Sequence, residues 1–271
     1  MDKEDRMDEE WQVEGPRTID LEGIDRLKIG LIAGQVDVVA HDEPTARVEV
    51  HTVSGRPLRI AVRGGSLVLD HPQIRWDDWL SAIRRFDGSA TADVSVLVPR
   101  RTALKLGVVS ASALVSGLTG DASISTVSGD VVVDGVTGDL QVNGVSADVA
   151  VREHDGAVVV RTVSGGITVA GRITDFASDG VSAPVFLEIA GAPRAVVVNT
   201  VSGGVTARLD ADVRIQYAIT TASGRLQLDD HREGHVRGRW TGVGGPEDGP
   251  RVPFRVNSVS GNVSVVHAAL A

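Results

Sequence analysis

Valine–serine pairs recur along the middle of the chain at a fixed interval of 18 residues. The pairs in strict register are Val109-Ser110, Val127-Ser128, Val145-Ser146, Val163-Ser164 and Val181-Ser182, and the interval then loosens to Val201-Ser202 and Ala222-Ser223. A weaker echo lies halfway between them, at Leu118-Thr119-Gly120, Val136-Thr137-Gly138 and His154-Asp155-Gly156. The repeating unit is therefore about nine residues long, and such a short fixed period is typical of a solenoid, whose units bury their apolar sides against their neighbours.

Within each unit, apolar residues alternate with polar ones. The alternating pairs are Val131 and Val133, Leu140 and Val142, Val149 and Val151, Val158 and Val160, and Ile167 and Val169. Residues two apart lie on the same face of a strand, so these side chains are expected to point into a shared interior. The residues that follow them, Asp134, Asn143, Arg152 and Arg161, are expected to point outward.

The pattern predicts an all-β, single-stranded parallel β-helix, that is, a β-solenoid. Each nine-residue unit would be a short strand and a tight turn, and two units would form a coil of 18 residues stacked about 4.8 Å from the next. Glycine would supply turns with positive φ, while Ser, Thr and Asp would bond the backbone of their own turn. The alternation of alanine and glycine after the serines leaves a wider coil of 36 residues open.

Composition supports this fold class and excludes several partners. Hydrophobic residues make up 42% of the 271 residues but aromatic residues only 3%, so small branched side chains must fill the core, as in β-structure. The net charge of −9 excludes nucleic acid and disfavours anionic lipid as a general partner. The chain has no cysteine, no apolar run near the roughly 20 residues that cross a bilayer, and no recognisable signal peptide. A cytoplasmic location is therefore expected, although a trimmed chain is not excluded.

Three regions are expected along the chain. Residues 1–16 predict a disordered acidic tail, and residues 17–101 an irregular β region with a hairpin at Gly64-Gly65. Residues 102–267 predict the solenoid, with a Gly- and Pro-rich loop inserted near 229–254.

A capping helix is expected near residues 74–86, inside the irregular region. Helical spacing is partly followed there by Ile74, Trp76, Trp79, Leu80, Ile83 and Phe86. A solenoid needs its open end covered, because exposed strand edges promote aggregation. A contact with a partner protein or a membrane surface is the alternative, and Asp77 and Asp78 argue against the membrane.

Two polar columns are candidate functional sites. The serine column consists of Ser110, Ser128, Ser146, Ser164, Ser182 and Ser202, and no His or Lys recurs beside it to act as a base, so a structural role is favoured over nucleophilic catalysis. The aspartate column consists of Asp121, Asp130, Asp139 and Asp148. Nine-residue calcium β-rolls are the alternative there, but the paired glycines of those repeats are missing, so a structural role is again favoured.

The segment near 229–254 contains a further candidate metal site. His231 and His235 are four residues apart, with Asp229, Asp230 and Glu233 nearby. That spacing forms a ligand pair only on a helix, which the neighbouring glycines disfavour, so a solvated loop is expected. We find no G-x-S-x-G, H-E-x-x-H, P-loop or dinucleotide-binding motif. No catalytic, cofactor or metal residue is therefore predicted.

Three segments together resemble a known family. They are "LKIGLIAGQVDVVAHDEPTARVEV", "ADVSVLVPRRTALKLGVVSA" and the iterated "TVSGDVVVDGVTGD". Over about residues 25–267 the chain is similar to the bacterial putative-adhesin domain of unknown function with β-strand repeats, grouped in the toast-rack superfamily. The resemblance implies a right-handed parallel β-helix and an association with bacterial cell-envelope stress systems, in which related domains are often joined to membrane segments. It supplies no catalytic residues.

These observations favour a non-catalytic scaffold or protein-interaction module that binds a protein partner or its own copies. One alternative is a carbohydrate-active enzyme, since β-helices carry such enzymes, with Asp134, Arg152, Glu153 and Arg161 as outward candidates. The scattered rows of these residues disfavour carbohydrate. The other alternative is a polymer-forming solenoid that resembles bactofilins, although the irregular amino-terminal part and the inserted loop make end-to-end stacking hard.

Overall fold

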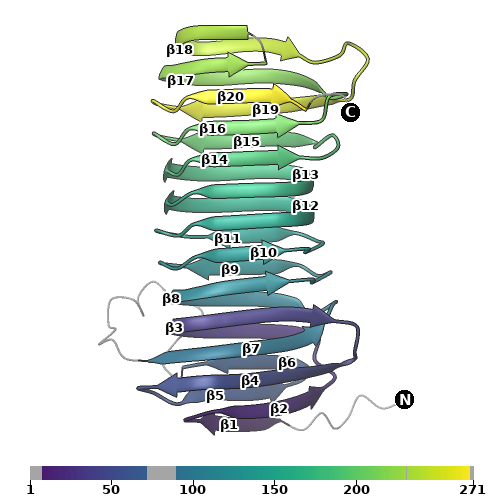
Figure 1. The fold of residues 1–271 in the computed structure, drawn as a ribbon, viewed down its shortest axis with the longest axis vertical. Helices are drawn as coiled ribbons and strands as arrows, with labels where there is room; N and C mark the ends of the chain where they lie inside the picture. Colours follow the sequence, from purple (N-terminus) through teal and green to yellow (C-terminus); the bar gives the residue numbers. More distant parts are fainter. Residues whose placement is uncertain (1–7, 72–89, 230, 269–271) are drawn as a thin grey trace. The chain divides into compact units, whose positions relative to one another are not determined.

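The computed structural model describes residues 8–71, 90–229 and 231–268, and the chain divides into two compact units, Met1–Val131 and Val132–Ala271 (Figure 1). Every helix or strand in these described ranges is a β-strand, so none of them is a helix that could cross a membrane. The strands of the first unit are β1 (Glu9–Val13), β2 (Arg17–Glu22), β3 (Arg26–His41), β4 (Thr45–Ser54), β5 (Leu58–Arg63), β6 (Ser66–Asp70), β7 (Thr91–Pro99), β8 (Ala103–Ser116) and β9 (Ala122–Thr126).

The second unit consists of shorter and longer strands in alternation with tight turns. Its strands are β10 (Val131–Asp134, which begins at the boundary), β11 (Leu140–Asn143), β12 (Val149–Ser164), β13 (Ile167–Ser182), β14 (Val185–Ile189), β15 (Ala195–Thr200), β16 (Val205–Leu209), β17 (Arg214–Leu228), β18 (His231–Gly244), β19 (Arg251–Ser258) and β20 (Val263–His267). The expected capping helix near 74–86 lies outside the described residues.

The first unit mixes parallel and antiparallel pairs. Its long strand β3 pairs in parallel with β6 and β7 along one edge and with β8 along the other. The pairs β4–β7, β2–β4, β1–β5 and β5–β6 are antiparallel. The boundary expected between residues 101 and 102 falls inside this unit, because β3 ties β7 and β8 together.

The hairpin expected at Gly64-Gly65 is confirmed. Strands β5 and β6 pair antiparallel with Arg63 opposite Ser66, so the two glycines form the whole loop. Their φ angles are +53° and +79°, a combination that a two-residue hairpin turn requires and that glycine adopts without strain.

The expectation of a disordered tail over residues 1–16 is wrong for residues 9–13. These residues form β1, which pairs with β5 from Glu9 opposite Val62 to Val13 opposite Leu58. Val13 is buried, so the apolar part of this acidic segment is enough to anchor it to the sheet. Acidic composition predicted disorder here, but backbone pairing with a buried neighbouring strand outweighs it.

Parallel pairing with a regular offset organises the second unit. Leu140 lies opposite Val158, and Val149 lies opposite Ile167, so each partner is 18 residues further along the chain. The offset grows to 20 residues where Val185 lies opposite Val205. The two extra residues belong to the wider β14–β15 connection.

The last strands do not stack in chain order. Strands β19 and β20 pair with β15 and β16 on one side and with β17 on the other, so the C-terminal strands fill the layer between β15–β16 and β17. Figure 1 shows this order in the green and yellow strands of the second unit. The final repeat therefore completes an interior layer of the unit.

The expectation of an inserted loop over residues 229–254 is also wrong. Most of this segment is β18, which pairs antiparallel with β17 from Leu228 opposite His231 to Ile215 opposite Gly244. Glycines indicated a loop, but glycine within a strand also permits bulges and bends. Gly238 has a φ of +90°, and it lies beside a register shift that lets β18 follow β17 around a corner.

The alternating apolar residues form the interior, as expected. Val131, Val133, Leu140, Val142, Val149, Val151, Val158, Val160, Ile167 and Val169 are all at most 1% exposed. Two phenylalanines, Phe176 and Phe254, are the largest fully buried side chains of the unit. Aliphatic layers and a parallel ladder thus define an all-β, β-solenoid-like domain.

Contrary to the expectation from the sequence, the hydroxyls of the turn do not all bond the backbone of their own turn. Thr162 Oγ1 donates to the Ser164 carbonyl at 2.8 Å and so closes its own turn. Ser164 Oγ instead lies within hydrogen-bond distance of two groups of the preceding layer, the Val145 carbonyl at 3.4 Å and Ser146 Oγ at 3.2 Å, to either of which its single hydrogen can be donated. At this turn, therefore, the threonine closes the turn and the serine joins one layer to the next.

Ser164→Ala should lower the free energy of unfolding by only about 1 kcal/mol, because a half-buried hydroxyl loses long bonds that water partly replaces. Thr162→Val should cost more, since that hydroxyl is buried and its bond is short. Urea denaturation followed by circular dichroism measures both values. A loss above about 3 kcal/mol for Ser164→Ala would contradict this division of roles.

Candidate interaction surface

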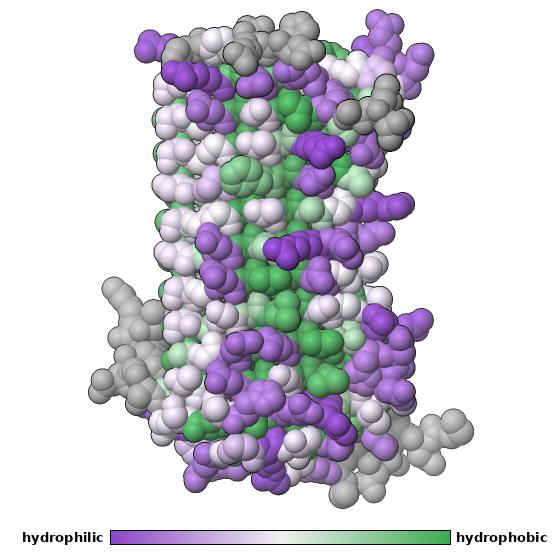
Figure 2. Space-filling view, viewed as in Figure 1, coloured by the Kyte–Doolittle hydropathy of each residue, from purple (hydrophilic) through white to green (hydrophobic). Residues whose placement is uncertain are grey.

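A column of valine side chains is exposed at one corner of the second unit. Val163 and Val181 lie near the ends of β12 and β13, and Val201 and Val259 directly follow β15 and β19. Their exposed fractions are 44–51%, whereas Val160, Val198 and Val256, three residues before Val163, Val201 and Val259, are buried. We call these four residues the valine ridge. Figure 2 shows more generally that hydrophobic side chains, in green, reach the surface between polar ones.

The backbone holds the valine ridge in register. The Val201 N–H donates to the Val181 carbonyl, and the Val259 N–H donates to the Val201 carbonyl, each at 3.2 Å. Val163 continues the column, because the residues on either side of it pair with those on either side of Val181. The valines therefore repeat at the separation of neighbouring strands, about 4.8 Å.

The local sequence explains why three of these valines point outward. Val163 and Val201 stand in T-V-S-G and Val259 in S-V-S-G, and the residue before each valine is the last inward one, so the valine falls on the opposite face. Thr200 Oγ1 accepts a bond from the Gly203 N–H at 2.9 Å, and Ser258 Oγ accepts one from the Gly261 N–H at 2.7 Å, which fixes the corner. The odd spacing from Val160 to Val163 was a signal of this exposure that sequence reasoning missed.

The serine column runs beside the valine ridge. Ser164 Oγ lies 3.2 Å from Ser146 Oγ, and the hydroxyls of Ser182 and Ser202 lie 3.1 Å apart. Their other bonds run to valine carbonyls of the preceding layer, as for Ser202 and Val181. These partners support the structural interpretation over a row of nucleophiles. The corner thus presents a row of methyl groups next to a row of hydroxyls.

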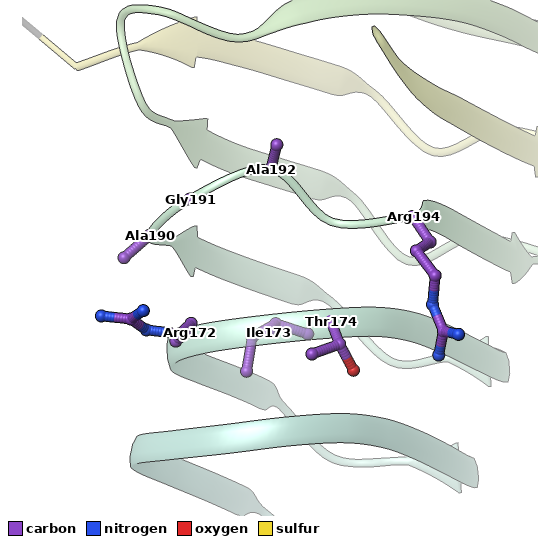
Figure 3. Close-up of a pocket in the computed structure, with 7 residues that line it drawn as sticks. All are labelled: Arg172, Ile173, Thr174, Ala190, Gly191, Ala192 and Arg194. Carbon is purple, nitrogen blue, oxygen red and sulfur yellow. The ribbon is translucent and has the colours of Figure 1, made fainter. Parts of the chain in front are cut away.

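A shallow groove of about 510 Å³ lies on the second unit between β13 and the β14–β15 connection. In Figure 3 the segment Ala190–Ala192 passes over Ile173 and Thr174, with Arg172 and Arg194 at the two ends. Arg194 Nε lies 2.8 Å from Asp175 Oδ2, and Arg172 Nε lies 3.8 Å from Asp155 Oδ2. Because both arginines already face carboxylates, the groove offers no free cation to a ligand.

The outward candidates for carbohydrate chemistry are spread along two strands. Asp134 ends β10 and is half-buried, whereas Arg152, Glu153 and Arg161 are exposed in β12. Arg161 Nε lies 3.6 Å from Asp179 Oδ2 of the next strand. Glu153 has a φ of +49° at the bend of β12, so its backbone marks a corner of the strand.

The aspartate column also serves the ladder. Asp148 Oδ1 accepts a bond from the Gly166 N–H of the next layer at 2.6 Å. The carbonyls of Asp121 and Asp130 accept bonds from Leu104 and Ala113. In the part of the chain that the structure describes, no group of three or more His, Asp or Glu side chains is placed to hold a metal ion.

The candidate metal ligands near residue 230 are only partly described. His231, Glu233 and His235 lie in β18, but their side chains and all of Asp230 are outside the described residues. Asp229 is engaged elsewhere: its carboxylate oxygens lie 2.8 and 2.9 Å from His267 Nδ1, and His267 Nε2 faces the Val213 carbonyl at 3.0 Å. This contact between two distant segments was not foreseen from the sequence.

Two further histidines are buried. His71 and His154 are each 1% exposed, and burial lowers the pKa of both imidazoles. Both rings are therefore neutral at pH 7 and lie out of reach of an external ligand.

The fold defines an all-β repeat protein whose most regular exposed feature is an apolar corner. The chain belongs to the Toastrack family DUF4097, whose model matches residues 27–266. No curated protein matches the sequence.

Three solved structures align with nearly all of the chain at low sequence identity. A putative cell adhesion protein from Clostridium sporogenes is 10% identical, covering 93% of this chain and 100% of that chain, with a TM-score of 0.24. A putative lipid binding protein from Parabacteroides distasonis is 12% identical, with coverage of 93% and 97% and a TM-score of 0.44. A putative adhesin from Bacteroides fragilis is 10% identical, with coverage of 93% and 98% and a TM-score of 0.39.

Proposed function

We propose that this chain is a non-catalytic interaction module that binds a protein partner through the valine ridge. The observation that carries the proposal is the exposure of four valines held in register at one corner. Aligned apolar side chains beside hydroxyls suit a protein surface, because methyl groups gain free energy on losing water and the hydroxyls bond at the rim.

Three finer statements belong to the same proposal. We infer that the second unit winds as a coil of about 18 residues, which the pairing offset of Leu140 and Val158 supports. A right-handed winding and a place in the bacterial cell-envelope stress response are supported by the family resemblance alone.

The double variant Val181→Asp/Val201→Asp tests the ridge. Affinity capture from the native cell with the immobilised full chain should recover a partner that this variant loses, because two carboxylates would be desolvated in the contact. The free energy of unfolding of this variant should change little, since Val181 and Val201 are both exposed. Thr168→Asp, at an exposed position of β13, is the matched control and should retain the partner. A partner that binds parent, control and ridge variant equally would contradict the proposal.

A further inference from the structure

Among the described residues, three strands pair with a single neighbour: β1 with β5, β2 with β4, and β18 with β17. The edges of β1 and β18 are the pair considered for assembly. The free edge of such a strand presents a row of N–H and C=O groups to which another strand can add. β1 belongs to the first unit and β18 to the second, so one copy carries both kinds of edge.

The edges of β1 and β18 carry opposite charge. The sequence of β18 contains three arginines and one glutamate, which gives +2 with neutral histidines. That of β1 contains two glutamates and no base, which gives −2, and Arg63 of the neighbouring β5 offsets one of these charges, since its Nη2 lies 3.3 Å from Glu10 Oε2. Arg237 and Arg239 of β18 are exposed, as are Glu9 and Glu10 of β1. Two copies of the same edge repel each other, whereas unlike edges attract.

A partly exposed tryptophan accompanies each edge. Trp11 of β1 lies opposite the buried Ile60, and Trp240 of β18 lies opposite the buried Ile219, so both face the interior side of their sheets. The Trp240 ring lies 6.0 Å from that of Tyr217. A contact that pairs the two edges would cover the exposed parts of both indoles.

We propose that β18 of one copy adds to β1 of a second copy, so that the chain assembles head to tail. This inference is independent of the valine ridge and goes beyond the proposed function. It removes one objection to end-to-end assembly, because the segment expected to be an obstructing loop is itself the edge strand. A heterologous contact of this kind repeats in every copy and gives an open filament or a closed ring.

Sedimentation velocity of the full chain at about 20 mM and about 500 mM salt tests the proposal, since salt screens exposed charges. At low salt the mean mass of the parent should rise with concentration to at least twice the 28.4 kDa of one chain, and high salt should reduce it. Arg237→Glu/Arg239→Glu should remain a monomer at low salt. Adding Glu9→Lys/Glu10→Lys in the same chain reverses both edges, restores the parent net charge and should restore assembly.

Arg152→Glu/Arg172→Glu is the control for net charge and should assemble like the parent. Circular dichroism shows whether each variant is folded, and tryptophan fluorescence reports the covering of Trp11 and Trp240. Three results would each overturn the proposal. The parent could stay monomeric at low salt, or the Arg237→Glu/Arg239→Glu variant could still assemble. The folded variant that also carries Glu9→Lys/Glu10→Lys could stay monomeric.

Discussion

Val160→Asp should lower the free energy of unfolding of the second unit by more than about 4 kcal/mol, whereas Val163→Asp, three residues later, should change it by no more than about 0.5 kcal/mol. Val160 is 0% exposed and Val163 is 50% exposed, so the two variants introduce the same charge on opposite sides of one strand.

The expected loss for Val160→Asp is above about 4 kcal/mol, because an isolated carboxylate loses its hydration in an apolar interior. Val142 and Ser178 lie opposite Val160 on the neighbouring strands. The single Ser178 hydroxyl cannot replace a hydration shell. Since the free energy of unfolding of a whole domain is only about 5–15 kcal/mol, this loss is a large part of it.

Urea denaturation of parent and variants, followed by circular dichroism, gives the comparison directly. If the urea midpoint of Val160→Asp equals that of the parent, the Val160 side chain does not point inward.

Gly165→Ala should destabilise the chain by about 2–4 kcal/mol, and Gly166→Ala should change stability by less than about 1 kcal/mol. Gly165 has a φ of +103°, and a Cβ placed there would lie 2.1 Å from the Ala147 carbonyl oxygen of the preceding layer. An alanine at this position would be strained at that φ angle, and its Cβ would overlap the Ala147 carbonyl oxygen unless the two layers moved apart.

Gly166 is the matched control, because a Cβ at that position would meet only Asp148 Oδ1, at an ordinary 3.5 Å. Differential scanning calorimetry measures both variants. Equal melting temperatures for the two alanine variants would contradict the close stacking of Gly165 on Ala147.

The alternation of apolar residues predicted the interior because a strand places every second side chain on one face. That rule correctly assigned residues such as Val133 and Leu140. The hairpin at Gly64-Gly65 was also readable, since only a few two-residue turns fit two strands and glycine suits them.

Strand partners were harder to predict than strand faces. The pairing of β1 with β5 and the placement of β19 beside β15 depend on contacts between distant segments, which no local pattern specifies. The glycines of β18 indicated a loop because the same residue serves turns and bulges. For the candidate surface, the valine–serine pairs were found from their period. The exposure of their valines was missed, although the odd spacing of Val163 from the buried Val160 indicated it.

Engineered disulfides report the register between neighbouring layers of the second unit. The chain has no cysteine, so each pair can be introduced alone. Ser146 and Ser164 lie opposite each other with their hydroxyl oxygens 3.2 Å apart, so Ser146→Cys/Ser164→Cys should form an intramolecular disulfide on mild oxidation. Ser146→Cys/Ser182→Cys spans two layers and should keep free thiols in the monomer. Peptide mass spectrometry that finds a 146–182 link and no 146–164 link would contradict the 18-residue register.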